Sequence, residues 1–466
     1  MKKKYFLLLA VAFMLLFSSN KVNAQEINSE FNKIINDLIE NYNQQNYQAI
    51  RKDFSDHLGT VFNETTTTQM FSGLYTDLGK IVNRKSSEIK SPYEIDVLVV
   101  FEINAEELVI SFTFSDKNEI LGLSLYSPEA TKINYPEITK STTIEEIAAP
   151  YVEKNKNSSL IIGIYDNGEE KFLKFGKNKN SDAFNINSIY EIGSVTKTFT
   201  ATILAIMVEN GEMNYDDPIS NYLPDSIPKL IKPNGKEITL EDLATHTSGL
   251  PRLPENLEKT IKNPLNPYAN YSLENLYDYL QTVKVGTSNY EYSNLGMGLL
   301  GEILATHSKM TYKELVKKYI TEELGMNNTE IKLSEVQQKN FLKGYNIEGQ
   351  LTPHWDFKTL EGAGAIRSTA KDMMSYLKAN LGINANNLKD ILAKIHKRRN
   401  QETALGWHLM QFNANEIVWH NGATYGFSSF IALDETNQKG IFILSNSGNI
   451  VDEMGIALLE LIDLQN

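Results

Sequence analysis

Strand-like segments stand at both ends of a long helical stretch in the C-terminal part of the chain, and this order limits the possible folds. Segments 160–165 and 171–175 are joined by Asp166-Asn167-Gly168, which is typical of a tight hairpin. Helical and loop-rich sequence then fills about 196–395. Strands return at 406–412, 417–420, 427–433 and 440–445, before an amphipathic helix over 454–461. We expect one antiparallel sheet, flanked by helices and carrying a large helical insertion, in a mixed α/β (α+β) fold.

The N-terminal part of the chain predicts a separate, smaller domain. Residues 26–78 carry apolar side chains three and four positions apart, as in helices, whereas 81–126 reads as strands joined by short turns. Helices followed by a strand meander predict a small α+β domain over 25–127. A stretch with two prolines follows and predicts a linker over 128–149. The second domain is then expected over 150–466.

The first residues have the pattern of an export signal. Three lysines, Lys2 to Lys4, precede an apolar stretch from Tyr5 to Phe17, and Val22-Asn23-Ala24 has the small residues of a cleavage site. An uncleaved membrane anchor is the alternative, but the apolar stretch is shorter than the ~20 residues of a spanning helix. We expect a signal peptide over 1–24, cleaved after Ala24. The mature protein is then periplasmic or secreted and keeps no stable membrane anchor.

Composition excludes several kinds of chemistry. The chain has no cysteine, so disulfides, thiolate metal sites and cysteine nucleophiles are excluded. The histidines lack metal-ligand spacing, so neither a metal nor another cofactor is expected. The formal charge is −13, and removal of residues 1–24, with four lysines and no acid, makes it more negative. Nucleic acid is therefore not an expected partner.

Ser194 and Lys197 form an S-x-x-K motif at the predicted start of a helix. Apolar residues follow at helical spacing, and Gly211 is a natural terminator. Side chains three apart share a helix face, so the lysine amine is expected beside the serine hydroxyl, where it can accept a proton. The alternative is a capping serine beside a surface lysine. The motif is common, so the catalytic interpretation needs support from elsewhere in the chain.

Two further segments supply that support. Tyr292-Ser293-Asn294 precedes a glycine-punctuated segment; the tyrosine can relay a proton and the asparagine amide can hold a substrate amide. A turn tyrosine with a capping asparagine is the alternative. The other segment, His420-Asn421-Gly422-Ala423, lies on a predicted strand, whose edge can bind an extended substrate. On its own, His420 would be interpreted as a packed histidine.

In this order, the three motifs resemble the serine β-lactamase-related family, which includes class C β-lactamases, D-alanyl-D-alanine carboxypeptidases, D-aminopeptidases and related esterases. The resemblance extends along about 150–466. Further matching segments are Glu191–Thr200, Asn210–Pro218, Tyr222–Pro224, Leu243–Pro251, Glu323–Met326 and Gly364–Met373. Ordered matches of this length are far more specific than a single short motif. The resemblance implies a serine β-lactamase-like fold and a serine hydrolase.

Position by position, the resemblance implies a role for each motif residue. Ser194 would be the acylated nucleophile, Lys197 its base or the group that tunes the base, and Tyr292 the proton relay. Asn294 would hold substrate. The backbone N–H groups of Ser194 and Ala423 would form the oxyanion hole, which is worth ~10²- to 10³-fold in rate per donor. The four residues 420–423 would line the substrate strand.

Two positions of that strand depart from the common pattern. His420 occupies the place of the lysine in the usual Lys-Thr-Gly triplet, as in several peptidases and esterases of the family. Its charge would be expected to vary near neutral pH, since a free imidazole has a pKa of ~6.5. Asn421 stands where many carboxylate-binding relatives have threonine. These departures leave the substrate open.

The leading hypothesis is an acyl-enzyme hydrolase of an amide or ester, most plausibly a D-amino-acid peptide of the cell wall or a related small molecule. Esterase or β-lactamase activity at the same site is the first alternative. A non-catalytic penicillin-binding or scaffold protein is the second. Segments around His246, and around His354 and Trp355, are interpreted as structural. The N-terminal domain resembles small cone-shaped accessory domains; its expected role is dimerisation, giving a homodimer, or positioning, with ligand binding as the alternative.

Overall fold

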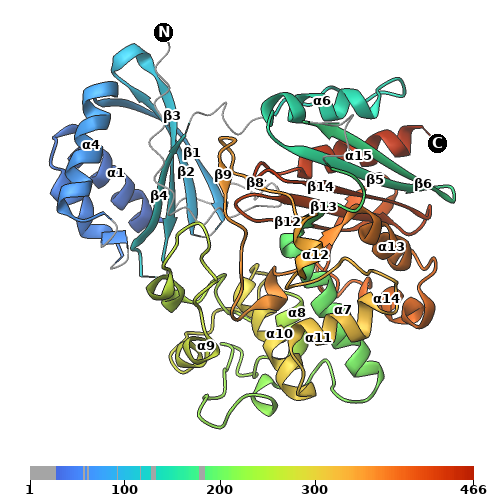
Figure 1. Ribbon diagram of the computed structural model, residues 1–466. Helices are drawn as coiled ribbons and strands as arrows, with labels where there is room; N and C mark the ends of the chain where they lie inside the picture. Colours follow the sequence, from blue (N-terminus) through green and yellow to red (C-terminus); the bar gives the residue numbers. More distant parts are fainter. Residues whose placement is uncertain are drawn as a thin grey trace. The chain divides into compact units, whose positions relative to one another are not determined.

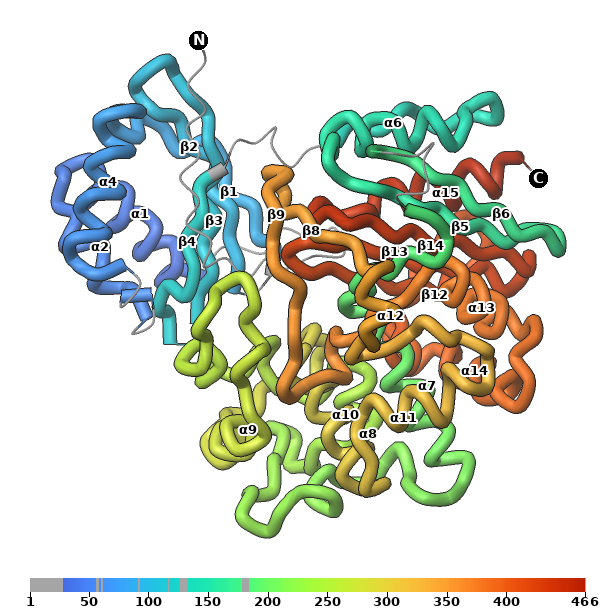
Figure 2. The backbone as a smooth tube through the Cα atoms, viewed as in Figure 1, coloured from blue at the N-terminus to red at the C-terminus, as the bar shows by residue number. Residues whose placement is uncertain are grey.

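The chain forms two compact units, Met1–Ile133 and Asn134–Asn466 (Figure 1, Figure 2). The expected signal peptide lies outside the described residues, and within those residues no helix is long and apolar enough to cross a membrane. The computed structural model describes residues 28–55, 58–59, 62–91, 93–115, 117–126, 133–177 and 184–465.

The first unit is built from helices followed by a four-stranded sheet. Its strands are antiparallel and pair in the order β1-β2-β3-β4. The elements are α1 (Ser29–Asn43), α2 (Tyr47–Ile50), α4 (Glu64–Leu78), β1 (Ile81–Ser91), β2 (Glu94–Phe101), β3 (Glu107–Phe114) and β4 (Ile120–Tyr126). Burial alternates along β2 and β3, so one face of the sheet is turned to the helices.

Local sequence explains where these helices begin and end. The Asn28 side chain accepts a hydrogen bond from the Glu30 amide and caps α1. Asn63 caps α4 in the same way, and Gly79, with a φ of 73°, ends it. The helices and the buried strand faces share one hydrophobic core, which includes Phe31, Ile35, Leu38, Phe71, Val97 and Phe112.

The second unit is organised around a six-stranded antiparallel sheet with the order β11-β12-β13-β14-β5-β6. Strand β14 pairs with β5, so the two ends of the unit meet in the middle of the sheet. This confirms the single sheet expected from the sequence. The strands are β5 (Ser159–Asp166), β6 (Glu169–Gly176), β11 (His408–Phe412), β12 (Asn415–Ala423), β13 (Ser428–Asp434) and β14 (Lys439–Ser445).

The remaining elements form the insertion and the flanking helices. Helices are α6 (Ile144–Lys154), α7 (Thr196–Glu209), α8 (Leu240–Ala244), α9 (Leu273–Leu280), α10 (Asn294–Ser308), α11 (Tyr312–Val316), α12 (Glu335–Gln338), α13 (Ala370–Asn380), α14 (Lys389–Ile395) and α15 (Asp452–Leu464). Two short pairs, β7 (Ile189–Glu191) with β10 (Arg367–Thr369) and β8 (Gly344–Tyr345) with β9 (Leu351–Thr352), complete the unit.

Helix α6 begins earlier than the domain boundary expected at residue 150. Thr143 and Glu146 form a capping box that starts the helix, and Pro150 lies inside it. A proline inside a helix removes a backbone hydrogen bond. Burial of Ile147 and Tyr151 offsets that loss. The structure therefore assigns 144–149 to the second unit.

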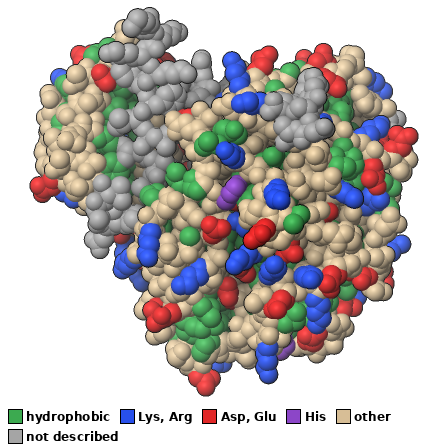
Figure 3. Space-filling model, viewed as in Figure 1, with side chains coloured by type: hydrophobic (Ala, Val, Ile, Leu, Met, Phe, Trp, Pro, Cys, Tyr) green, Lys and Arg blue, Asp and Glu red, His purple; other side chains and the backbone are tan. Residues whose placement is uncertain are grey.

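Helices cover both faces of the six-stranded sheet (Figure 1). Helix α15 packs on β13 and β14 on one face, and α13 packs on β5 and β14 on the other. Helix α7 is buried along almost its whole length, as the central helix of the insertion. On the face seen in Figure 3, basic and acidic side chains are interspersed.

Candidate active site

Ser194 lies where the chain leaves β7 and approaches the central helix α7. A single 3-10 turn, Gly193–Val195, comes before the first α-helical residue, Thr196. Ser194 lies inside this turn, two residues before the α-helix begins and slightly before the position expected from the sequence. Its neighbours Gly193 and Val195 are buried, whereas Ser194 is partly exposed. It is the accessible residue of an otherwise closed turn.

Lys197 contacts three oxygen atoms, and their chemistry determines how its amine is used. Its Nζ atom lies 2.9 Å from Ser194 Oγ, 2.8 Å from Asn294 Oδ1 and 2.7 Å from the Ala363 carbonyl oxygen. The amide and carbonyl oxygens can only accept hydrogen bonds. A neutral amine would donate its two N–H groups to them, and its lone pair would face the Ser194 hydroxyl.

Burial favours the neutral form of this lysine. Lys197 is fully buried, with no exposed surface. Burial lowers the pKa of its amine well below the ordinary lysine value, and the positive charge of Arg252 lowers it further. Geometry and electrostatics together arrange Lys197 as a proton acceptor for Ser194.

Tyr292 and Asn294 reach the same point from the start of α10. The Tyr292 hydroxyl shares a hydrogen bond with Ser194, and burial raises its pKa to about 12, so the phenol keeps its proton. Its ring centroid lies 4.9 Å from Lys197 Nζ. Ser293, between them, caps α10 by accepting a hydrogen bond from the Gly296 amide. Asn294 also shares a hydrogen bond with Tyr268, so its amide joins Lys197 to an aromatic side chain.

Two glycines bring the Ser194 turn against strand β12. A Cβ atom on Gly193, which has a φ of +49°, would lie 2.6 Å from the Ala423 nitrogen. One on Gly422 would lie 2.1 Å from the Ile192 carbonyl oxygen and 2.9 Å from the Ser194 nitrogen. Real side chains do not approach so closely, so only glycine fits at both positions. The backbone nitrogens of Ser194 and Ala423 are thereby brought to the same place.

His420 is buried beside this cluster in its neutral form. Its Nδ1 lies 2.6 Å from the Asn421 carbonyl oxygen, which can only accept, so Nδ1 carries the proton. Its Nε2 is then an acceptor, and it is buried without a partner. Burial, followed by the charges of His408 and Lys197, lowers the pKa of His420 well below the ordinary histidine value. The expected change of charge near neutral pH is therefore wrong, because burial excludes the imidazolium.

The Asn421 side chain is directed away from Ser194. Its amide donates a 2.5 Å hydrogen bond to Asp452, at the start of α15. Residues directly opposite on paired strands share a face, and the partner of Asn421 is Phe430, which contacts Gly455 of α15. Side chains alternate along a strand, so Asn421 lies on the face opposite to that of His420.

Two histidines that sequence reasoning left out of the site belong to the cluster. His246 was interpreted as structural; its ring lies 4.4 Å from that of Tyr292, and its Nδ1 accepts a hydrogen bond from the Ser293 amide at 3.1 Å. His408, on the neighbouring strand β11, lies 4.7 Å from His420 between ring centroids. Burial lowers the pKa of His408 to about 4. No motif marked His408, since only strand pairing brings it near.

Arg252 is the other residue that the sequence did not mark. Its guanidinium carbon lies 5.0 Å from the Tyr292 ring centroid. After burial, its charge is the next cause of the lowered pKa of Lys197. Burial raises the pKa of Tyr292, and the charge of Arg252 opposes part of that rise. Arg252 directly follows the matched segment ending at Pro251, so its position was visible in the sequence but its orientation was not.

A group of aromatic side chains lies next to Asn294. Tyr268 stacks on Phe357 at 4.5 Å and contacts Trp355 at 5.4 Å, and Trp355 in turn contacts Tyr425 at 5.2 Å. The Trp355 amide donates to buried Glu191, three residues before Ser194. Trp355 was interpreted as packing only; its half-buried ring is part of this aromatic group.

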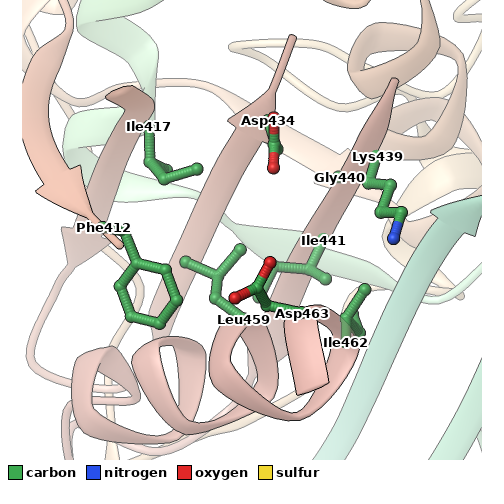
Figure 4. Close-up of a pocket in the computed structure, with 9 residues that line it drawn as sticks. All are labelled: Phe412, Ile417, Asp434, Lys439, Gly440, Ile441, Leu459, Ile462 and Asp463. Atoms are coloured by element: carbon green, nitrogen blue, oxygen red, sulfur yellow. The ribbon is translucent and has the colours of Figure 1, made fainter. Parts of the chain in front are cut away.

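Outside this cluster, the described residues of the second unit also enclose a small cavity. This cavity of about 20 Å³ lies between the sheet and α15, lined by aliphatic side chains, Phe412, Asp434, Lys439 and Asp463 (Figure 4). That volume suits about one water molecule. Within the described ranges, no group of three or more histidine, aspartate or glutamate residues could hold a metal ion.

Comparison with known proteins identifies relatives of the second unit. The family model described as "Beta-lactamase" matches residues 144–461. A beta-lactamase of Yersinia enterocolitica is 26% identical over 369 residues, which cover 70% of this chain and 91% of that protein. The D-alanyl-D-alanine-carboxypeptidase/endopeptidase AmpH of Escherichia coli K12 is 27% identical over 350 residues, or 70% of this chain and 89% of AmpH.

Solved structures share the fold. A class C beta-lactamase from Rhodobacter sphaeroides superposes with a TM-score of 0.60 at 22% identity, covering 69% of this chain and 98% of that one. A beta-lactamase/D-alanine carboxypeptidase from Pseudomonas syringae gives a TM-score of 0.59 at 21% identity, with coverage of 69% and 98%. At this identity the superpositions establish the architecture of the second unit.

Proposed function

The chain belongs to the beta-lactamase family of serine hydrolases, and we propose that it cleaves an amide or ester through an acyl-enzyme on Ser194. One observation carries the proposal. Buried Lys197 meets two oxygens that can only accept hydrogen bonds, and its third contact, at 2.9 Å, is the Ser194 hydroxyl. A neutral amine in this position is a base aimed at a nucleophile.

The proposed reaction begins with transfer of the Ser194 proton to Lys197. Oγ then attacks the substrate carbonyl, and the backbone N–H groups of Ser194 and Ala423 stabilise the oxyanion that forms. Collapse of the tetrahedral intermediate breaks the bond to the leaving group, which takes a proton from Tyr292. The tyrosine regains a proton from Lys197, so the acyl-enzyme forms with both groups neutral. Water repeats the sequence and releases the acid.

The substrate class we propose is a D-amino-acid peptide of the cell wall or a related small molecule. The name of AmpH, which includes both carboxypeptidase and endopeptidase activity, supports a peptide substrate. The beta-lactamases among the relatives support the alternative, a β-lactam or ester substrate at the same site. A non-catalytic, penicillin-binding role is less well supported, because Ser194, Lys197 and Tyr292 are present and in mutual contact.

We also propose that the protein acts outside the cytoplasm. The charge and apolar pattern of residues 1–24 supports an export signal that is cleaved after Ala24. Sequencing the N-terminus of the mature protein would test this, with Gln25 expected as the first residue. We propose that the N-terminal unit positions or dimerises the hydrolase unit; sedimentation of the purified chain would test dimerisation.

Covalent labelling tests the central proposal. The purified protein would be exposed to a fluorophosphonate and, separately, to a labelled β-lactam, and its intact mass measured beside that of Ser194→Ala. We expect one adduct on the native chain and none on the variant. The absence of any adduct on the native chain would contradict the proposal, and an adduct surviving on the variant would place the nucleophile elsewhere. Hydrolysis of D-Ala-D-Ala peptides, D-amino-acid amides, nitrocefin and short esters would then rank the substrates.

A further inference from the structure

Arg252 is a positive charge that lies against Tyr292, the proposed proton relay, and has no carboxylate partner among the described residues. Its guanidinium carbon lies 5.0 Å from the Tyr292 ring centroid, and Arg252 is only partly exposed. Its Nε atom is buried without a hydrogen-bond partner. Across the described part of the chain, no carboxylate forms an ion pair with it. A buried donor normally has a hydrogen-bond acceptor, so the Nε of this guanidinium is available to an acceptor on a ligand.

The backbone around Arg252 is fixed to the segment that carries Tyr292. The Leu295 amide donates a 3.0 Å hydrogen bond to the Arg252 carbonyl oxygen. The Ser293 hydroxyl donates one of 2.7 Å to the Pro251 carbonyl oxygen. Both bonds end at the start of α10, so Arg252 is anchored to the segment that presents Tyr292 and Asn294. Its position relative to the reacting groups is therefore preorganised.

The strand side of the site offers no comparable charge. His420 is neutral, because its Nδ1–H donates to the Asn421 carbonyl oxygen and its Nε2 is an acceptor. An acceptor repels a carboxylate. The Asn421 amide is already bound to Asp452 on the other face of the sheet. A substrate anion would find no cation at residues 420 and 421.

We infer that Arg252 binds a carboxylate on the ester or amide that Ser194 attacks. The inference rests on the proposed function and specifies its substrate class, an acidic ester or amide. A guanidinium presents a planar set of donors that matches a carboxylate, and the unpartnered Nε is one of them. The substrate carboxylate would then be bound by the segment that follows Pro251, and not by residues 420–423 of β12.

A purely electrostatic role is the competing explanation. Arg252 helps to lower the pKa of Lys197, so it could support the base without touching the substrate. In that case, loss of Arg252 would change the binding of acidic and neutral substrates equally. Anion binding, in contrast, would affect only the acidic members of a matched series.

Equilibrium binding separates these explanations. We would use full-length protein carrying Ser194→Ala, which cannot form the acyl-enzyme, and two pairs of phenyl esters. Within each pair a carboxylate is replaced by its neutral carboxamide, on the phenol in one pair and at the end of the acyl chain in the other. Calorimetry would give the Kd of every ester for Ser194→Ala alone and combined with Arg252→Gln or Arg252→Lys.

Arg399→Gln is the matched control in the same background. The Arg399 guanidinium carbon lies 4.9 Å from the Tyr215 ring centroid, much as Arg252 lies over Tyr292. Unlike Arg252, it has a carboxylate partner, Glu241, at 3.4 Å. Thermal melting of each variant would establish that it is folded before binding is compared.

We expect Ser194→Ala to bind the carboxylate member of at least one pair more tightly than the carboxamide. Arg252→Gln should reduce this preference by about 10- to 100-fold, the range of a hydrogen bond to a charged group, with little change in the Kd of the carboxamide. Arg252→Lys should keep part of the preference and Arg399→Gln all of it.

The inference is overturned if neither pair shows a preference, if the preference survives Arg252→Gln, or if that variant weakens both members equally. Failure of the proposed function would look different. The native chain would then lack a Ser194 adduct, while the binding preference of the Ser194→Ala protein would still depend on Arg252.

Discussion

At the scale of single residues, Lys197 connects the elements of the site. Its amine touches the Ser194 turn, Asn294 on α10 and the Ala363 carbonyl, so three segments distant in sequence meet at one nitrogen. Burial makes the charged form costly, and Arg252 adds to that cost. The lysine therefore joins three segments of the fold, and its neutral form is the one the geometry suits.

Substitution of Lys197 should abolish most of the acylation rate. Lys197→Arg keeps a long cation but removes a group that can become neutral, because arginine is not deprotonated in proteins. We expect the acylation rate to fall by about 10²- to 10⁴-fold, the usual contribution of general base catalysis. Stopped-flow acylation by a chromogenic ester would measure it. A variant within tenfold of the native rate would show that another group is the base.

The same lysine predicts the pH dependence of acylation. The amine must be neutral to accept the Ser194 proton, so the rate should rise with pH as Lys197 loses its charge. Because its pKa is lowered well below the ordinary lysine value, this rise should be complete at a pH below that value. A rate that keeps rising to the pH where free lysines titrate would contradict the lowered pKa.

At the scale of elements, the close contact between the Ser194 turn and strand β12 shapes the site. Glycines at 193 and 422 remove the two Cβ atoms that would separate these segments. Strand β12 pairs with β11 only as far as Trp419, so residues 420–423 of β12 have no β11 residue opposite them. Strand pairing therefore leaves residues 420–423 at an edge of the sheet, and Gly193 and Gly422 allow the Ser194 turn to approach that edge.

Gly422→Ala should disable the site through this contact. Its Cβ would need to displace the Ile192 carbonyl oxygen, which would lie 2.1 Å away, and the Ser194 nitrogen nearby. We expect acylation to fall by at least ~10²-fold, as for loss of one oxyanion donor. Gly73→Ala is the control, because a Cβ on this α4 residue meets nothing within 4 Å. Equal rates for Gly422→Ala and native protein would refute the close contact.

The buried carboxyl of Asp452 predicts one contribution to the pH dependence of stability. Burial raises the pKa of Asp452 to about 7 in the folded protein, above its value in the unfolded chain. The folded state thus binds this proton more tightly, so the contribution of Asp452 to stability is greatest at low pH and falls as pH rises towards 7. Asp452→Asn removes the titration and keeps an amide oxygen for Asn421.

Melting temperatures measured between pH ~4 and ~8 would test this linkage. Asp452→Asn should lose less stability than the native chain as pH rises. The Tm of the variant minus that of the native chain should therefore increase across this interval. Asp463→Asn changes an exposed carboxylate of the same helix and should follow the native profile. Parallel curves for the native chain and Asp452→Asn would contradict the raised pKa.

At the scale of the whole molecule, each of the two units has its own core. The first unit closes its sheet with α1 and α4, and the second closes its sheet with α6 and α15 on one face and α13 on the other. Every residue assigned to the site lies in the second unit, as does the match to the family. Catalysis by the second unit therefore should not require the first.

Two shortened chains would test this division. A chain starting at Asn134 should fold and be labelled at Ser194, because it keeps all of α6. A chain starting at Pro150 loses Ile147, which is fully buried, at a cost of about 1.5–3 kcal/mol for that side chain alone. Its Tm should be clearly lower. Equal melting of both chains would show that α6 does not stabilise the sheet.

Much of the second unit could be predicted from local sequence. Strand-like segments at both ends of the unit predicted the antiparallel sheet. The alternation of side chains along a strand and its β-branched composition are local properties, and a strand must bury a face against other strands. Ser194, Lys197, Tyr292 and Asn294 were marked by short motifs, and the structure brings all four together. The second unit begins before the expected boundary at 150, because α6 already starts at Ile144, behind the capping box of Thr143 and Glu146.

The sequence by itself marked the residues that are proposed to carry the chemistry, since side-chain type and spacing along one helix turn are local. Only the tertiary structure decided their state. It buried Lys197 and His420 and thereby made their neutral forms the favoured ones, and it turned Asn421 away from the site. It also brought Arg252, His246 and His408 to Tyr292. Burial and charge proximity depend on segments far apart in the chain, so no local pattern contains them.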